Sequence, residues 1–137
     1  MSNITGGCHC GAIRYQVEGD LIVHALCHCS DCRRHAGAPV VGWTMYAEDA
    51  VKVTKGQPKV YESSEHGRRH FCADCGTQLA FCTPGSATVD ITIATLDDPS
   101  KVKPVRQIGM ESHLPWALDL KSLPATTTEE NAGADFL

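Results

Sequence analysis

The sequence lacks the features that place a protein in a membrane or on a nucleic acid. No segment approaches the ~20 consecutive apolar residues that a membrane-spanning helix needs. Acidic residues outnumber basic ones by 16 to 12, and the resulting net charge of −4 opposes contact with phosphate backbones. The first residues have neither the basic patch nor the apolar run of a signal peptide. We therefore expect a cytoplasmic protein with no nucleic-acid or membrane partner.

Helical patterns are scarce as well. Short segments that alternate apolar and polar residues follow one another between turn residues, and they span residues 12–18, 40–46, 50–54, 59–63, 77–82 and 88–96. This pattern favours an antiparallel, mainly β fold. One short helix is expected from Ser30, which can cap it, to about Gly37. We expect a single domain over residues 1–124, followed by a flexible polar tail over residues 125–137.

Cysteine, in contrast, is abundant, with eight among 137 residues. Structural disulfides are uncommon in a reducing cytosol, so these cysteines need another explanation. Redox catalysis by a Cys-x-x-Cys pair usually accompanies a βαβ unit, and no such unit is visible in the pattern. An iron–sulfur cluster is a weaker alternative, because seven clustered thiolates divide more naturally into groups of four and three. The sequence therefore favours metal binding.

The cysteines fall into three clusters. Two are close pairs, each followed by a glycine that permits a tight turn, and such pairs commonly supply two thiolates to a tetrahedral zinc ion. Together these pairs predict one structural site with four thiolates: Cys8, Cys10, Cys72 and Cys75. The third cluster predicts a second site with three thiolates, which is the number of protein ligands in catalytic zinc sites: Cys27, Cys29 and Cys32.

The eighth cysteine, Cys82, lies in an apolar segment, and we interpret it as a small core residue. The alternative is a fourth ligand that closes the second site. His9 and His28 each lie between two ligating cysteines, so we expect both to be solvated turn residues rather than ligands. His66, Arg68, Arg69 and His70 are expected at an exposed hairpin tip.

Three residues after the second cluster are candidates for binding a substrate: Arg33, Arg34 and His35. A zinc ion with three thiolates carries a net charge of −1, which nearby guanidinium groups would offset. The same groups could hold a substrate carboxylate, although two solvated arginines on a short helix are an equally simple interpretation. For a general acid or base, the sequence offers only His35 and Glu111 as guesses.

The cysteine motifs resemble those of the glutathione-dependent formaldehyde-activating enzymes, a family that also includes centromere protein V. The matching stretches are residues 6–11, 27–33 and 71–77, with further likeness at residues 94–99 and 114–116. The resemblance implies a β-tent fold, one structural and one catalytic zinc ion, and a carbon–sulfur lyase reaction that joins glutathione to formaldehyde. It assigns the same seven cysteines to the same two sites. Gln107 departs from the family, which often has histidine at this position.

The leading hypothesis is thus a zinc-dependent carbon–sulfur lyase that acts on glutathione, or on a similar thiol adduct of a small aldehyde. In the second zinc site, a small-molecule thiol would fill the fourth position and bind there as its thiolate. The alternative is a non-catalytic, zinc-stabilised binding module in which both sites are closed. The sequence leaves the oligomeric state open.

Overall fold

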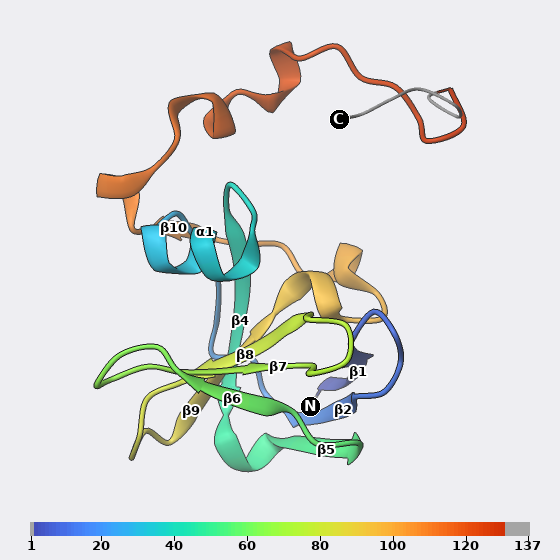
Figure 1. Ribbon diagram of the computed structural model, residues 1–137, viewed down its shortest axis with the longest axis vertical. Helices are drawn as coiled ribbons and strands as arrows, with labels where there is room; N and C mark the ends of the chain where they lie inside the picture. The colour runs from blue at the N-terminus through green and yellow to red at the C-terminus, as the bar shows by residue number, and fades with distance from the viewer. Residues whose placement is uncertain (1, 131–137) are drawn as a thin grey trace.

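Two β-sheets and one short α-helix make up the part of the chain that the structure describes (Figure 1). The computed structural model describes residues 2–130, so most of the expected tail, residues 131–137, lies outside the described residues. The smaller sheet is antiparallel and has the order β1-β2-β5, with β1 at Ser2–Gly7, β2 at Arg14–Gly19 and β5 at Val51–Lys55. The predicted mainly β fold with little helix is confirmed. Within residues 2–130, no helix is long and apolar enough to cross a membrane.

The larger sheet has seven strands in the order β10-β3-β4-β9-β8-β7-β6. Its strands are β3 (Val23–Cys27), β4 (Val41–Ala47), β6 (Lys59–Glu62), β7 (Arg68–Phe71), β8 (Gln78–Cys82), β9 (Thr88–Thr92) and β10 (Arg106–Ile108). Every pairing is antiparallel except that of β10 with β3, which is parallel. This late strand returns the chain to the region of the second cysteine cluster.

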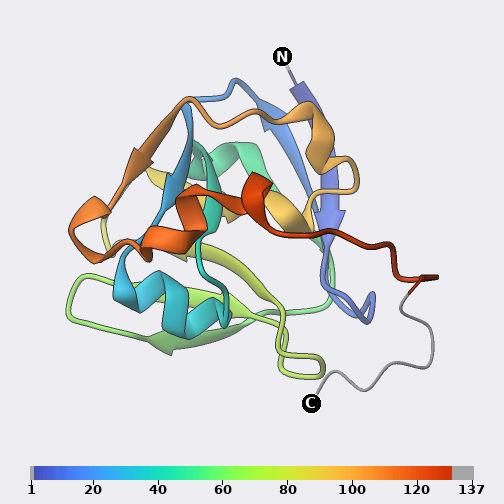
Figure 2. The same cartoon turned by 90° about the horizontal axis from the view of Figure 1, so that it is seen from above.

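The helix α1 covers Ser30–Ala36, close to the prediction. Its N-cap is Cys29 rather than Ser30, and Gly37 ends it in the left-handed conformation, with φ at 64°. The remaining helical segments are 3-10 turns: Glu48–Ala50, Ile93–Thr95, Pro99–Lys101, Met110–Ser112, Pro115–Leu118 and Leu120–Ser122. The last of these follow β10 along the end of the molecule where α1 lies (Figure 2).

One strand prediction was wrong in part, and four strands were not predicted: β1, β3, β7 and β10. The segment expected to continue as strand to residue 96 leaves the sheet after Thr92 and forms a 3-10 turn, in which Ile93 still packs into the core. Strand β1 was not predicted, because its glycines have low strand propensity. The structure explains Gly6, where a Cβ atom would collide with the hydroxyl of Tyr15 on the adjacent strand.

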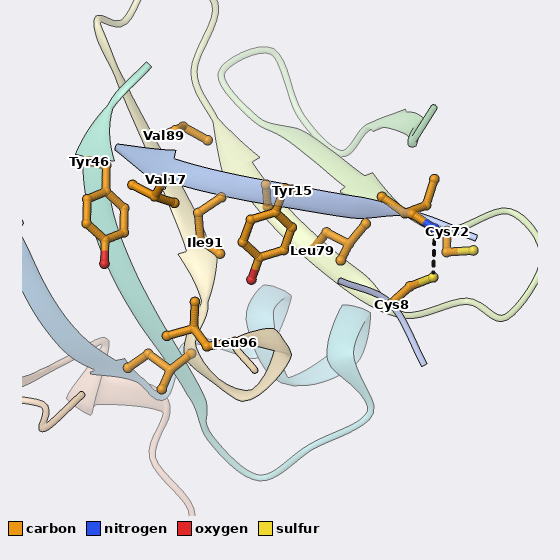
Figure 3. Close-up of a cluster of buried hydrophobic side chains, with 12 residues drawn as sticks. Cys8, Tyr15, Val17, Tyr46, Cys72, Leu79, Val89, Ile91 and Leu96 are labelled. Atoms are coloured by element: carbon orange, nitrogen blue, oxygen red, sulfur yellow. Dashed lines mark hydrogen bonds between the residues drawn. The ribbon is translucent and has the colours of Figure 1, made fainter. Parts of the chain in front are cut away.

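The main core lies between the two sheets. Tyr15 and Val17 of β2 pack there against Leu79, Val89 and Ile91 of the larger sheet, and the sulfur atoms of Cys8 and Cys72 lie at one end of this cluster (Figure 3). A second, smaller cluster is made by a different set of buried side chains: Cys27, Cys32, Val41 and Trp43. The four-cysteine group therefore adjoins the main core, and the three-cysteine group belongs to the smaller cluster.

Candidate metal centres and the adjoining cavity

The first and third cysteine clusters meet in space, as their spacing predicts. The four sulfur atoms of Cys8, Cys10, Cys72 and Cys75 all lie within 4.8 Å of one another. The sulfur of Cys10 is 3.6 Å from that of Cys8 and 3.8 Å from that of Cys72. Two thiolates bound at ~2.3 Å to a tetrahedral zinc ion are about 3.8 Å apart. The four-thiolate group therefore fits a zinc ion, and these separations are far too long for disulfides.

Two tight turns of the same design present these cysteines. Gly11 and Gly76 have φ values of 81° and 80°, the left-handed conformation that glycine adopts at little cost. Each glycine donates its backbone N–H to the carbonyl of the first cysteine of its pair, at 3.2 Å for Cys8 and 2.8 Å for Cys72. Hydrogen bonds from the Thr77 side chain and backbone lower the pKa of Cys75 to about 5. The turn after Cys72 thus favours the thiolate form of Cys75.

The second cluster gathers at the start of α1. Cys27 ends β3, Cys29 caps the helix, and Cys32 follows on its first turn, so that their sulfur atoms also lie within 4.8 Å of one another. The backbone N–H of Cys32 donates to the sulfur of Cys29 at 3.3 Å. Burial raises the pKa of Cys27 to about 12, so its ionised form needs a compensating cation. Three converging sulfur donors of this kind fit zinc.

Arg69 contacts the second cluster, and the sequence did not indicate it. Its guanidinium nitrogens donate to the sulfur of Cys32 at 3.8 and 3.9 Å, and its charged group lies 5.0 Å from the centre of the Phe81 ring. Only 5% of Arg69 is exposed, and Arg68 and His70 are half-buried in the same strand, so of the four residues expected at an exposed hairpin tip only His66 is exposed. Alternation along β7 explains the difference, because Arg69 faces the opposite side of the strand from Arg68. A guanidinium group other than those of Arg33 and Arg34 therefore contacts this cluster.

A cavity of about 350 Å³ opens beside the three cysteines. One row of neighbouring residues across the larger sheet forms much of its wall: Val23, Met45, Asp90, Phe81 and Arg69. The other lining residues are Ala25, Trp43, Ile108, Asp31, Arg106, Ser63 and Ser64. The cysteines therefore lie in the wall of a largely apolar cavity.

Asp90 is the second cavity residue that the sequence did not identify. It lies in β9 between the buried Val89 and Ile91, and the alternation of the strand turns it to the cavity face. Burial raises the pKa of its carboxyl from 3.8 to about 6. Asp90 occupies a polar position of the alternating segment at residues 88–96, and the alternation gives no sign that this face lines a cavity.

Two of the three predicted substrate-binding residues line a different depression from that of the cysteines, and Arg33 lines neither. Arg34 and His35 line a hollow of about 340 Å³ together with Tyr61, whose ring stacks on that of His35 with the ring centres 5.9 Å apart. Arg33 donates from Nε to the carbonyl of His28 at 3.3 Å. Glu111, the other guess for a general acid or base, is exposed on a 3-10 turn.

His28 is buried, with 1% of its surface exposed, so the expectation of a solvated turn residue was wrong. Its Nε2 is 2.7 Å from the side-chain oxygen of Gln107, and its backbone N–H donates to the carbonyl of Ile108 at 2.9 Å. Both partners belong to β10, which pairs with β3, the strand that ends at Cys27. His9 is exposed, as expected. Gln107, noted for departing from the family pattern, is therefore the partner of a buried histidine.

Cys82 packs against the main core, and its sulfur is 3.6 Å from Nε2 of His70. This agrees with the interpretation of Cys82 as a small core residue. Among residues 2–130, neither potential metal-binding group of cysteines includes Cys82 or a histidine. Neither Cys82 nor a described histidine is therefore in position to be the fourth ligand of the second group.

Comparisons with known proteins agree with this architecture. A family model described as "Glutathione-dependent formaldehyde-activating enzyme" matches residues 3–112, and the chain belongs to that family. An uncharacterized lyase from Schizosaccharomyces pombe is 31% identical over 81 residues, which cover 59% of this chain and 58% of the relative. A putative glutathione-dependent formaldehyde-activating enzyme from Halomonas elongata is 30% identical over 87 residues, which cover 56% of this chain and 54% of the relative. The chain thus spans little more than half the length of these relatives.

A crystal structure of a Rhodobacter sphaeroides protein shares the fold. Its TM-score is 0.60 at 24% sequence identity, and the match covers 75% of this chain and 98% of the other. At this identity the likeness concerns the fold alone.

Proposed function

We propose that this protein is a zinc-dependent carbon–sulfur lyase that acts on the adduct of a thiol, glutathione or a similar molecule, with a small aldehyde. The observation that carries the proposal is the three-cysteine group in a cavity wall, for which the described residues offer no fourth ligand. Three protein ligands and an accessible fourth position are the arrangement of catalytic zinc. Family membership and the names of the two relatives support the same reaction class.

The two groups of cysteines have different proposed roles. Cys8, Cys10, Cys72 and Cys75 would hold a structural zinc ion that joins the start of the chain to the turn after β7. The second group would hold the zinc ion that takes part in the reaction. When bound there, zinc would supply a Lewis acid that favours the thiolate form of a substrate thiol.

The reaction itself moves one proton between sulfur and oxygen. In the cleavage direction, the adduct's hydroxyl loses its proton, the carbonyl forms, and the carbon–sulfur bond breaks with its electron pair moving to sulfur. In the reverse direction, the sulfur attacks the carbonyl carbon and the oxygen takes up the proton. Asp90 is suited to carry this proton, because it lines the cavity and its pKa of about 6 lies near neutral pH.

Arg69 has a supporting role in this proposal. Its contacts with Cys32 and Phe81 fix the guanidinium group between the cysteines and the aromatic wall. There its charge offsets the excess negative charge of a three-thiolate zinc site. Arg34 and His35, in the adjoining hollow, remain candidates for the charged ends of a larger substrate, since Asp31 and Arg69 border both spaces.

The proposal can be tested by exchange NMR, with ¹³C-formaldehyde and glutathione at equilibrium. The zinc-loaded protein should increase the rate at which label passes between free formaldehyde and the adduct. Cys29→Ala should abolish the increase, whereas Cys82→Ser, which alters a cysteine outside both groups, should retain it. Equal exchange rates with the wild type and Cys29→Ala would refute the proposed function.

A further inference from the structure

The cavity beside the three cysteines is more apolar than a formaldehyde adduct requires. Its apolar wall includes Trp43, Phe81, Met45, Val23 and Ala25. Trp43 and Ala25 are each only 5% exposed, and the Trp43 and Phe81 rings meet edge to face with their centres 6.3 Å apart. A wall of this kind favours an apolar group, because such a group leaves water when it binds.

The cavity has four charged lining residues: Asp31, Asp90, Arg69 and Arg106. Asp31 and Arg106 are exposed, which places them at its mouth. Arg69 is already engaged by Cys32 and Phe81. Inside the cavity, the carboxylate of Asp90 and the guanidinium group of Arg69 balance each other, so the interior offers no surplus charge for the carboxylates of glutathione. The charged part of such a thiol therefore belongs at the mouth, where it can remain hydrated.

The position of the substrate sulfur then decides what fills the interior. If the sulfur lies at the cysteines and the charged part of the thiol points outward, the remaining substituent of the adduct faces the apolar wall. In a formaldehyde adduct this substituent is only hydrogen, and most of the cavity of about 350 Å³ stays unfilled. An alkyl chain or an aromatic ring would cover it.

We propose that the protein selects thiol adducts of aldehydes that carry an apolar substituent, which binds between Trp43, Phe81 and Met45. This inference rests on the proposed function, since it takes the three-cysteine site as the place where the substrate sulfur binds. It assigns substrate selection to the apolar wall of β3, β4 and β8.

Non-reactive thioethers of glutathione provide suitable probes, because the head group stays constant while the substituent on sulfur grows. S-methyl-, S-propyl- and S-hexylglutathione can be titrated against the zinc-loaded Trp116→Phe variant, in which Trp43 is the one remaining tryptophan. Affinity, followed by Trp43 fluorescence, should rise about two- to fourfold for each added methylene until the cavity is filled. Equal affinity for the methyl and hexyl compounds would overturn the inference.

Two variants check that the gain comes from this wall. Ala25→Val narrows the cavity and should remove most of the gain for the hexyl compound while changing methyl affinity less than twofold. Ala87→Val, at an exposed turn, is the matched control and should behave like the parent. If Ala25→Val loses zinc, Met45→Ala replaces it and should shift the preference to longer chains. Loss of affinity for both compounds alike would contradict the inference.

The failure of this inference can be told apart from the failure of the proposed function. Binding of glutathione itself to the cobalt-substituted protein reports on the three-cysteine site through its absorption spectrum. A spectral change with glutathione, combined with no dependence on chain length, refutes the inference alone. No spectral change with any thiol refutes the proposed function, and with it the selection proposed here.

Discussion

Asp90→Asn should stabilise this protein while impairing its reaction. Burial raises the pKa of the Asp90 carboxyl from 3.8 to about 6, so the folded state disfavours the charged form. Each pKa unit corresponds to ~1.4 kcal/mol, which gives a penalty of about 3 kcal/mol once the carboxylate is ionised in both states. Residual solvent contact reduces this figure, and we expect a gain of about 1–3 kcal/mol for the neutral amide at pH 8.

The stability of the wild type should depend on pH through the ionisation of Asp90. Because the folded-state pKa is raised, the folded protein binds this proton more tightly than the unfolded chain. The wild type therefore loses stability as pH rises from about 4 to 6, and stays destabilised above that window. By this linkage, the advantage of Asp90→Asn should be about half as large at pH 5 as at pH 8. Urea unfolding of both proteins at both pH values, with zinc present throughout, measures it.

Asp49→Asn is the matched control, since Asp49 is exposed on a 3-10 turn. Its effect on the free energy of unfolding should stay within ~0.5 kcal/mol at either pH. The exchange rate of the formaldehyde adduct should fall in Asp90→Asn and be unchanged in Asp49→Asn. Lower stability of Asp90→Asn than of the wild type at pH 8 would show that the carboxylate stabilises the fold. An unchanged exchange rate in this variant would show that Asp90 does not carry the proton.

Three further predictions test other parts of the structure. Cys72→Ser should unfold the protein or strongly destabilise it, because structural zinc contributes on the order of 10 kcal/mol in small domains. Cys29→Ala should lose one zinc ion and keep the circular dichroism spectrum of the wild type. Equal destabilisation by the two substitutions would refute the separate roles of the two sites. Arg69→Gln should release zinc to a chelator faster than the wild type, and Arg68→Gln should not; identical release rates would remove Arg69 from the site. Gly76→Ala should lower the free energy of unfolding by about 1–2 kcal/mol, because the backbone at this position has a φ of 80°. No atom lies close enough to clash with the added methyl group, so the conformation alone would cause the loss. An unchanged unfolding midpoint would contradict this cause.

The cysteine groups were predictable because ligand pairs in tight turns are local features. The residue spacing and the following glycines indicate the turns at Cys8 and Cys72, and zinc chemistry then limits how the clusters combine. The mainly β fold was predictable for a similar reason, since alternation is visible within each short segment. Strand β1 was not, because pairing with β2 along its whole length forms it in spite of its glycines.

Arg69 and Asp90 depend on pairing between distant strands. The neighbours of Asp90 are Met45 and Phe81, which are far apart in the sequence, and Arg69 reaches Cys32 from β7. No local pattern encodes these neighbours. A buried arginine or aspartate also looks like a surface residue in the sequence, because burial of such groups depends on partners or function. His28 was misjudged for the same reason, since β10 covers it only after the chain returns.

The most direct test of the central claim is the absorption spectrum of the protein with cobalt in place of zinc, recorded with and without glutathione. Seven cysteines should bind two cobalt ions per chain, and the thiolate-to-cobalt absorption should reflect seven sulfur bonds. Added glutathione should increase this absorption by the contribution of one more thiolate, and Cys29→Ala should abolish the increase. Two bound ions with a spectrum that saturating thiol leaves unchanged would contradict an accessible catalytic site.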